Sequence, residues 1–121
     1  MTKSRRAPNA DESAYIVACK DGLCVACWIR SKQPDCPWQF FPVTGCDFHH
    51  FKSGNVRRGH LFGVGLCGWH HRSLLHFGCT HNEMRETFGP SLMDGSRLFH
   101  DFYGSDDELL AVQHELNGGA P

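Results

Sequence analysis

The middle of the chain reads FHHFKSGNVRRGHLFGVGLCGWHH (residues 48–71), and this stretch decides the fold. Apolar and aromatic residues over 40–51, with a turn at 44–45, predict a short strand that ends on the histidine pair. A turn over 53–59 and a returning strand over 61–66 follow. A helix is then expected from Cys67 to about Leu75. The predicted order is strand, turn, strand, helix.

Helices are predicted on both sides of this unit. The first covers residues 10–20, capped by Asn9 or Asp11 and stopped at 21–22. Residues 22–35 are interpreted as a cysteine knuckle followed by a loop. Further helices are expected over 82–88, 95–103 and 105–116, the last capped by Ser105 with acids in its first turn. We expect one domain over residues 10–117, with disordered tails at 1–9 and 118–121.

Two pairs of metal-binding side chains have zinc-site spacing. Cys24 and Cys27 are separated by two residues, as are Cys67 and His70 about forty residues later. One pair on a knuckle and one pair at a helix start can together provide the four ligands of a tetrahedral site, so a structural Zn²⁺ is predicted. The alternative is a set of buried free thiols. Cys46 is a substitute for one ligand, whereas Cys19, Cys36 and Cys79 are interpreted as outside the site.

The histidine pair His49–His50 indicates a second site. Adjacent side chains on a strand point to opposite sides, so the pair can supply one metal ligand and one free base. His71 follows the expected zinc ligand His70 and would therefore be held rigidly. It could ligate, from the helix, the same ion as the histidine pair. The alternative is that these histidines complete a second structural zinc site. His81, His100 and His114 are interpreted as surface or capping residues.

Charge is unevenly distributed along the 121 residues, whose formal net charge is −1. The near-neutral total argues against a protein that simply coats nucleic acid. Between Phe48 and Asn82, however, the chain has no acidic residue. Basic side chains in this interval are candidates for contacts with a phosphate backbone, although a solvated surface is the alternative for each one. These candidates are Lys52, Arg57, Arg58 and Arg72.

Cysteine content and hydropathy suggest the cellular setting. Seven cysteines is an odd number, and the N-terminal region lacks a basic start followed by an apolar run. We therefore expect a reducing, intracellular environment rather than secretion. The longest uncharged run, residues 60–71, is too short to span a bilayer, so a soluble protein with no membrane partner is expected.

The histidine and cysteine pattern resembles that of the HNH, or ββα-metal, nucleases. The relevant residues are the pair His49–His50, then His60, then the run LCGWHH at 66–71. Together with the run SRLFHDFYGSDDELL at 96–110, they resemble the Ref family, phage recombination enhancement nucleases that depend on RecA filaments. The similarity covers roughly residues 22–112. It implies an α+β fold with a small zinc-stabilised ββα-metal (HNH) core and flanking helices.

The resemblance also implies roles for individual residues. His49 and His71 would bind the catalytic metal, and His50 would be the general base that activates water. His60 stands at the middle position of the motif, where it steadies the base or assists at the metal. The family's further helix histidine falls on Leu75, with His76 one step beyond as the alternative third ligand.

The activity implied is hydrolysis of DNA phosphodiester bonds. In-line attack by water needs a base of near-neutral pKa and a cation at the developing charge, here one Mg²⁺, Mn²⁺ or Zn²⁺. The resemblance further implies action in the cytoplasm of a bacterial host, on DNA and with RecA filaments, by a monomer or weak dimer. Two alternatives stand: a non-catalytic zinc-bound module for DNA or protein interaction, and an HNH nicking endonuclease that does not need RecA.

Overall fold

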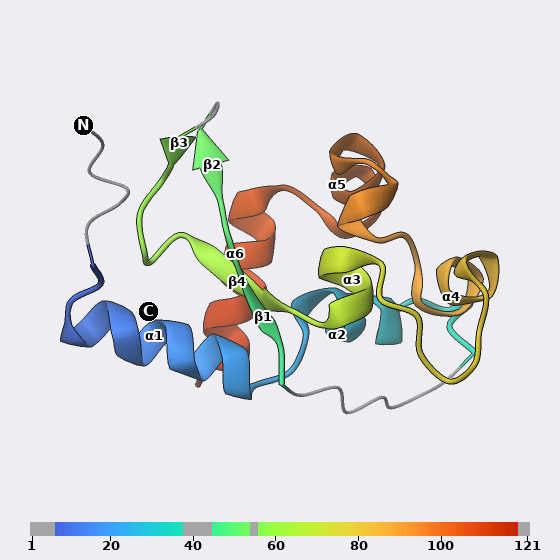
Figure 1. Cartoon of the computed structure of the whole chain (residues 1–121), viewed down its shortest axis with the longest axis horizontal. Helices are drawn as coiled ribbons and strands as arrows, with labels where there is room; N and C mark the ends of the chain where they lie inside the picture. The colour runs from blue at the N-terminus through green and yellow to red at the C-terminus, as the bar shows by residue number, and fades with distance from the viewer. Residues whose placement is uncertain (1–6, 38–44, 54–55, 119–121) are drawn as a thin grey trace.

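The computed structural model describes residues 7–37, 45–53 and 56–118, and the fold is α+β. At its centre β1 (Asp47–His50) pairs antiparallel with β4 (Gly63–Leu66), with His49 opposite Val64 and His50 opposite Gly63. Figure 1 shows this pair crossing the middle of the molecule. The predicted strand residues 40–44, the turn apex at 54–55 and most of both predicted tails lie outside the described residues.

A second antiparallel ribbon lies between the two central strands in sequence. It consists of β2 (Lys52–Ser53) and β3 (Val56–Arg57), and it extends away from the central pair in Figure 1. Phe51 joins the two ribbons, because its amide donates to the carbonyl of Phe62 at 2.8 Å and its carbonyl accepts from the amide of Arg58 at 2.9 Å. The predicted turn therefore carries short strands.

Helices α1 (Ala10–Asp21) and α6 (Asp106–Leu116) both contact β4. The N-terminus of α1 is closed by a capping box between Asn9 and Glu12, close to the predicted start. The backbone of α1 approaches β4 so closely that a Cβ on Gly65 would lie 2.3 Å from the carbonyl oxygen of Cys19. On the α6 side, Oε1 of buried Gln113 accepts a 2.8 Å hydrogen bond from the amide of Gly65.

The segment predicted as a loop after the first cysteine pair is instead helical. Helix α2 covers Val25–Ser31, and Cys24 is its N-cap, with Sγ accepting from the amide of Cys27 at 3.4 Å. The predicted loop is wrong here because the cysteine pair occupies a helix start. Helix α3 (Gly68–Arg72) is shorter than predicted, since Ser73 adopts a left-handed conformation with φ 55°.

Two of the three remaining elements agree with the predicted helices, whereas the short 3₁₀-helix between them was not predicted. The three are α4 (His81–Phe88), the 3₁₀-helix η2 (Leu92–Asp94) and α5 (Ser96–Tyr103). The core lies where α2, α3, α5 and α6 meet the central strands, and it contains Phe51, Trp69, Phe99 and Leu109. Among the described residues, no helix combines the length and apolar character needed to cross a bilayer.

Candidate active site and metal centre

Three cysteines and one histidine meet at the starts of α2 and α3. Cys24 caps α2 and Cys27 lies in its first turn, while Cys67 occupies the N-cap position of α3 and His70 lies inside that helix. All four side chains are buried, and their ligand atoms lie within 4.8 Å of one another. The structure thus brings together the four residues predicted from spacing, as a group that could hold a metal ion such as zinc.

The geometry of this group suits Zn²⁺. Nδ1 of His70 is 3.3, 3.5 and 3.6 Å from the sulfur atoms of Cys67, Cys27 and Cys24. Zinc bonds of about 2.0–2.1 Å to nitrogen and 2.3 Å to sulfur place tetrahedral ligands roughly 3.5 Å apart. Nε2 of His70 lies 2.8 Å from the carbonyl oxygen of Phe88. Donation there leaves the Nδ1 lone pair for the metal.

The chemistry of the thiols also favours a cation. Hydrogen bonding to Cys24 and Cys67, together with burial, raises the pKa of Cys27. The raised pKa disfavours a third thiolate in the metal-free group, so three thiolates here would need a positive ion among them. Cys46, the predicted substitute, lies outside the group of four, and its thiol donates to the carbonyl of Gly22 at 3.6 Å.

The two adjacent histidines of β1 contact different partners. The ring of His49 lies 5.4 Å from that of His71, centroid to centroid, and the ring of His50 lies 5.5 Å from that of His60. Nε2 of His50 is 3.4 Å from Nδ1 of His60. His49 therefore faces His71 on α3, whereas His50 faces His60, just before β4. This divergence is expected for adjacent residues on a strand.

Asp47 is a site residue that the sequence interpretation missed. Its Oδ2 accepts from Nδ1 of His71 at 2.9 Å and from Nε of Arg72 at 2.7 Å. The hydrogen bond from His71 lowers the pKa of Asp47. A donor at Nδ1 leaves the lone pair of His71 on Nε2. A signal was available, because Asp47 precedes His49 by two residues and two-residue spacing puts side chains on one face of a strand.

Both histidines of β1 are disposed to be neutral. Burial, reinforced by the charge of His71 and opposed by that of Asp106, lowers the pKa of His49 to about 4. Burial and the charges of Arg57 and His60 also lower the pKa of His50. A neutral imidazole is the form that can ligate a metal or accept a proton.

A groove runs along β1, and its opposite wall comes from the C-terminal helices. Nε2 of His100 on α5 lies 2.7 Å from Oδ1 of Asp106, the first residue of α6, and Nδ1 of His100 lies 2.8 Å from the carbonyl oxygen of Ser96. Sequence reasoning could not find this wall, because it depends on where α5 and α6 lie against β1. The groove is lined by His49, His50, Phe51, Lys52, Leu92, Ser96, His100 and Asp106.

The predicted alternative ligand His76 lies elsewhere. It lines an apolar cavity beside the cysteine group, together with Phe77, Met84 and Trp69. The Trp69 indole is buried there and donates from Nε1 to the carbonyl of Gly89 at 2.9 Å. The structure therefore places His76 in a cavity different from the groove that contains His49.

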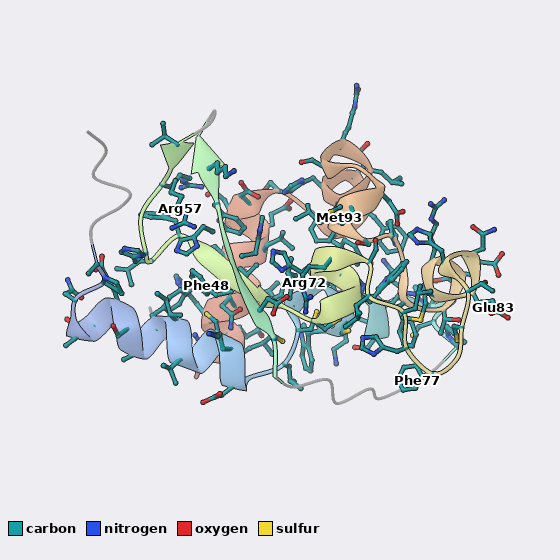
Figure 2. The ribbon with its side chains drawn as sticks, in the orientation of Figure 1. Phe48, Arg57, Arg72, Phe77, Glu83 and Met93 are labelled. Atoms are coloured by element: carbon teal, nitrogen blue, oxygen red, sulfur yellow. The ribbon has the colours of Figure 1, made fainter. Side chains whose placement is uncertain are left out.

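The four basic candidates have different surroundings. Lys52 lines the groove, and Arg57 is exposed on β3. Figure 2 shows Arg57 at the ribbon end of the molecule and Arg72 near its centre. The Arg58 guanidinium lies 4.6 Å from the ring centroid of Phe62 and 3.4 Å from Asp107, while Arg72 is bound by Asp47 as described above.

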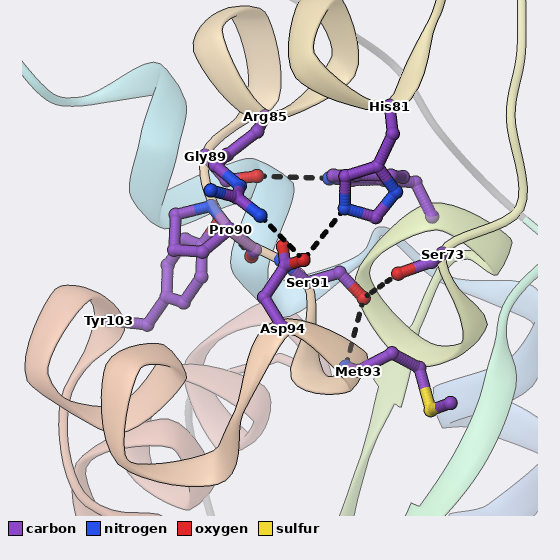
Figure 3. A network of polar contacts seen from close by, with 10 residues as sticks. Ser73, His81, Arg85, Gly89, Pro90, Ser91, Met93, Asp94 and Tyr103 are labelled. Atoms are coloured by element: carbon purple, nitrogen blue, oxygen red, sulfur yellow. Dashed lines mark hydrogen bonds and ion pairs between the residues drawn. The ribbon is translucent and has the colours of Figure 1, made fainter.

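A polar network fixes the segment that leads into α5. Asp94 has a nearly buried carboxylate that accepts from His81 at 2.7 Å, from Arg85 at 3.0 Å and from the amide of Ser91 at 2.9 Å. The hydroxyl of Ser73 at the end of α3 donates to that of Ser91 at 2.8 Å. Figure 3 shows these contacts joining α3, α4 and η2. His81 is therefore part of an ion-pair network rather than a simple cap.

Comparison with known proteins identifies the family. A family model described as "Recombination enhancement, RecA-dependent nuclease" matches residues 8–117. A search among curated proteins gives no match. The matched range includes the cysteine group, the groove and both C-terminal helices. The chain therefore belongs to the family of RecA-dependent recombination enhancement nucleases.

Proposed function

We propose that this protein is an HNH-type DNA endonuclease that hydrolyses phosphodiester bonds with one histidine-bound divalent cation. The observation that carries the proposal is the separation of the two histidines of β1. His49 lies beside His71, whereas His50 has a different histidine partner, yet both line one groove. A metal ligand and a base that work on one phosphate need this arrangement.

His49 and His71 are the proposed ligands of the catalytic cation. His49 is neutral because its pKa is about 4, and His71 presents Nε2 because Asp47 occupies its Nδ1. When bound, a Mg²⁺, Mn²⁺ or Zn²⁺ ion would stabilise the negative charge that develops on the phosphate and the leaving oxygen. Asp47 is a positioning residue, because it fixes the orientation and tautomer of His71.

His50 is the proposed general base. Nε2 of His50 lies 3.4 Å from Nδ1 of His60, and in the proposed tautomer Nε2–H donates to His60 and leaves the lone pair on Nδ1 of His50. That nitrogen removes a proton from the attacking water, and His60 holds the ring in place. The lowered pKa of His50 keeps it in the unprotonated form at neutral pH.

DNA is the proposed substrate, approached through its phosphate backbone. We assign phosphate contacts to Lys52 in the groove and to Arg57 on the exposed ribbon beside it. Arg58 and Arg72 provide further positive charge. The setting that we propose is the cytoplasm of a bacterial host, where a phage or prophage recombination function acts with RecA filaments. One proposed active site per monomer would give one strand cut per visit, unless the protein forms a weak dimer.

The test is a cleavage assay on supercoiled plasmid and on duplex DNA invaded by RecA-coated single strands. Wild type is compared with His50→Ala, and His114→Ala serves as the control because it lies outside the groove. We expect metal-dependent cutting that is lost only in His50→Ala while bound zinc is retained. If bare plasmid were cut as fast as the duplex invaded by RecA-coated strands, a RecA-independent nicking enzyme would be favoured. No cutting under any condition would favour a non-catalytic zinc-bound module.

A further inference from the structure

Two basic side chains stand directly opposite each other on the ribbon formed by β2 and β3. Lys52 on β2 pairs with Arg57 on β3 in the antiparallel register. Directly opposite residues of such a pair project from the same face, with their Cβ atoms about 4.5–5.5 Å apart. Both residues are exposed, and Figure 2 shows Arg57 at the ribbon end of the molecule. The ribbon therefore holds two positive charges side by side.

These two charges are not compensated within the described part of the chain. Like charges directly opposite each other destabilise a ribbon, and strands as short as β2 and β3 add little stability of their own. Among the described residues, neither Lys52 nor Arg57 has an ion-pair partner. Asp106, the carboxylate that lines the same groove as Lys52, instead accepts from His100 at 2.7 Å. An anion from outside the chain would relieve the repulsion between the two cations.

The other two basic candidates differ, because each has an acidic partner. The guanidinium of Arg58 lies 3.4 Å from a carboxylate oxygen of Asp107. Nε of Arg72 lies 2.7 Å from Oδ2 of Asp47. The four candidates from the sequence thus separate into two that are compensated within the protein and two that are not.

The uncompensated pair lies beside the proposed general base. Lys52 and His50 both line the groove, and the step of two residues between them is about 6.6 Å in an extended chain. Phe51, between them, is hydrogen bonded through its backbone amide and its carbonyl to the opposite segment. The charge of Arg57 also acts on His50, whose pKa it lowers. This separation matches that of neighbouring phosphates along a nucleic acid strand, so the base and the cation pair are spaced to serve successive phosphates.

We infer that Lys52 and Arg57 together bind one phosphate group of the DNA backbone, the neighbour of the phosphate that is cut, and so hold the strand against His50. This inference rests on the proposed function and names a subsite within it. The pair acts as one unit, whereas Arg58 and Arg72 contribute much less to the affinity for DNA.

The first test measures the affinity of the full-length, zinc-loaded protein for a fluorescently labelled DNA duplex, by anisotropy over a range of KCl concentrations without added Mg²⁺ or Mn²⁺. The double variant Lys52→Gln with Arg57→Gln is compared with Arg58→Gln with Arg72→Gln, which removes the same charge. The first should bind at least about tenfold more weakly than wild type. Because one phosphate contact is lost, the slope of log affinity against log salt should become shallower by about one. The second should bind nearly as wild type.

Other results of this measurement would contradict the inference. A slope that becomes shallower by about two would place Lys52 and Arg57 on separate phosphates. Equal losses in the two double variants would show a positive surface without a subsite. Either result would overturn the shared phosphate and leave the proposed function intact. A wild-type protein that does not bind DNA would count against DNA as the substrate, and therefore against the proposed function itself.

The second test locates the phosphate. Cuts are mapped in duplex DNA invaded by RecA-coated single strands, and the linkage on either side of a mapped cut is replaced in turn by an uncharged methylphosphonate. One of the two replacements should lower cutting at that position by wild type, but not by the double variant of Lys52 and Arg57 at saturating protein, each relative to its own cutting of unmodified DNA. Equal sensitivity of both proteins would overturn the inference, and no cutting by wild type would count against the nuclease itself. Retained zinc and an unchanged melting temperature establish that each variant is folded.

Discussion

One oxygen atom, Oδ2 of Asp47, holds two neighbouring side chains of α3. Because Nδ1 of His71 donates to this oxygen, the lone pair of the His71 ring is on Nε2. The neighbour Arg72 helps to keep the carboxylate ionised, since its charge also lowers the pKa of Asp47. The orientation of a proposed metal ligand thus depends on a residue that need not touch the metal.

Replacing Asp47 by alanine should weaken binding of Mn²⁺ by about 10- to 100-fold, because His71 loses the contact that fixes its tautomer. The metal concentration at half-maximal cleavage and the Mn²⁺ dissociation constant should move together. Arg72→Gln is the matched control, because it removes the other partner of the same oxygen and should leave the Mn²⁺ dissociation constant unchanged. Equal dissociation constants for Asp47→Ala and wild type would show that His71 is oriented by other contacts.

The pH dependence of cleavage should reflect His50. A base acts in its neutral form, and burial together with Arg57 and His60 lowers its pKa below the usual value of about 6.5. The acid limb of kcat should therefore lie below that value, and a bound cation would lower it further. Arg57→Ala removes a positive charge, so the pKa should rise and the limb should move to higher pH. Measuring kcat at saturating DNA separates this shift from any loss of DNA binding. An acid limb that stays at the same pH in Arg57→Ala would exclude His50 as the titrating base.

At the scale of elements, short local signals set most helices. Capping boxes at Asn9, Thr80 and Ser105 fix the starts of α1, α4 and α6, and these starts agree with the sequence to within a residue or two. Helix α2 was not predicted, because Cys24 is both the cap of this helix and a member of the cysteine group that could hold a metal ion, and only the second feature was recognised. The groove could not be predicted, since its two walls are brought together by packing rather than by any local pattern.

The junction of α4, η2 and α5 depends on Asp94. Removal of its carboxylate would leave the buried amide of Ser91 unpaired and release His81 and Arg85. Asp94→Ala should therefore lower the free energy of unfolding at neutral pH by about 1–3 kcal/mol. Urea denaturation measures this loss, and Asp101→Asn, an exposed change on α5, should have little effect. Because η2 and α5 form part of the groove wall, Mn²⁺ affinity should fall as well; an intact affinity would show that the wall is held without this junction.

At the scale of the whole molecule, the cysteine group lies within the core rather than beside it. Cys24, Cys27 and Cys67 are members of the same buried cluster as Phe51 and Leu109. Zinc binding and folding should therefore be coupled, as in other small metal-stabilised domains. The proposed catalytic cation, in contrast, lies in an open groove and contributes little to the core.

Removing the two kinds of metal should have different consequences. A chelator that is strong enough for Mg²⁺ or Mn²⁺ but too weak for thiolate-bound zinc should abolish cleavage and leave the melting temperature nearly unchanged. Removing zinc, or replacing Cys67 by alanine, should abolish cooperative unfolding. Circular dichroism in the near ultraviolet and a zinc assay follow the two events. A single transition in which both metals and the fold are lost together would contradict the separation of the two sites.

The burial of Trp69 beside the cysteine group has a practical consequence. Its indole lines the same cavity as Cys27, Cys67 and His70, and its hydrogen bond to Gly89 holds it in one orientation. Loss of zinc would change the polarity around this ring, so its fluorescence should shift to longer wavelength as water enters. The protein therefore contains its own optical reporter, which would allow zinc occupancy to be followed in real time, without a label, while the enzyme acts on DNA.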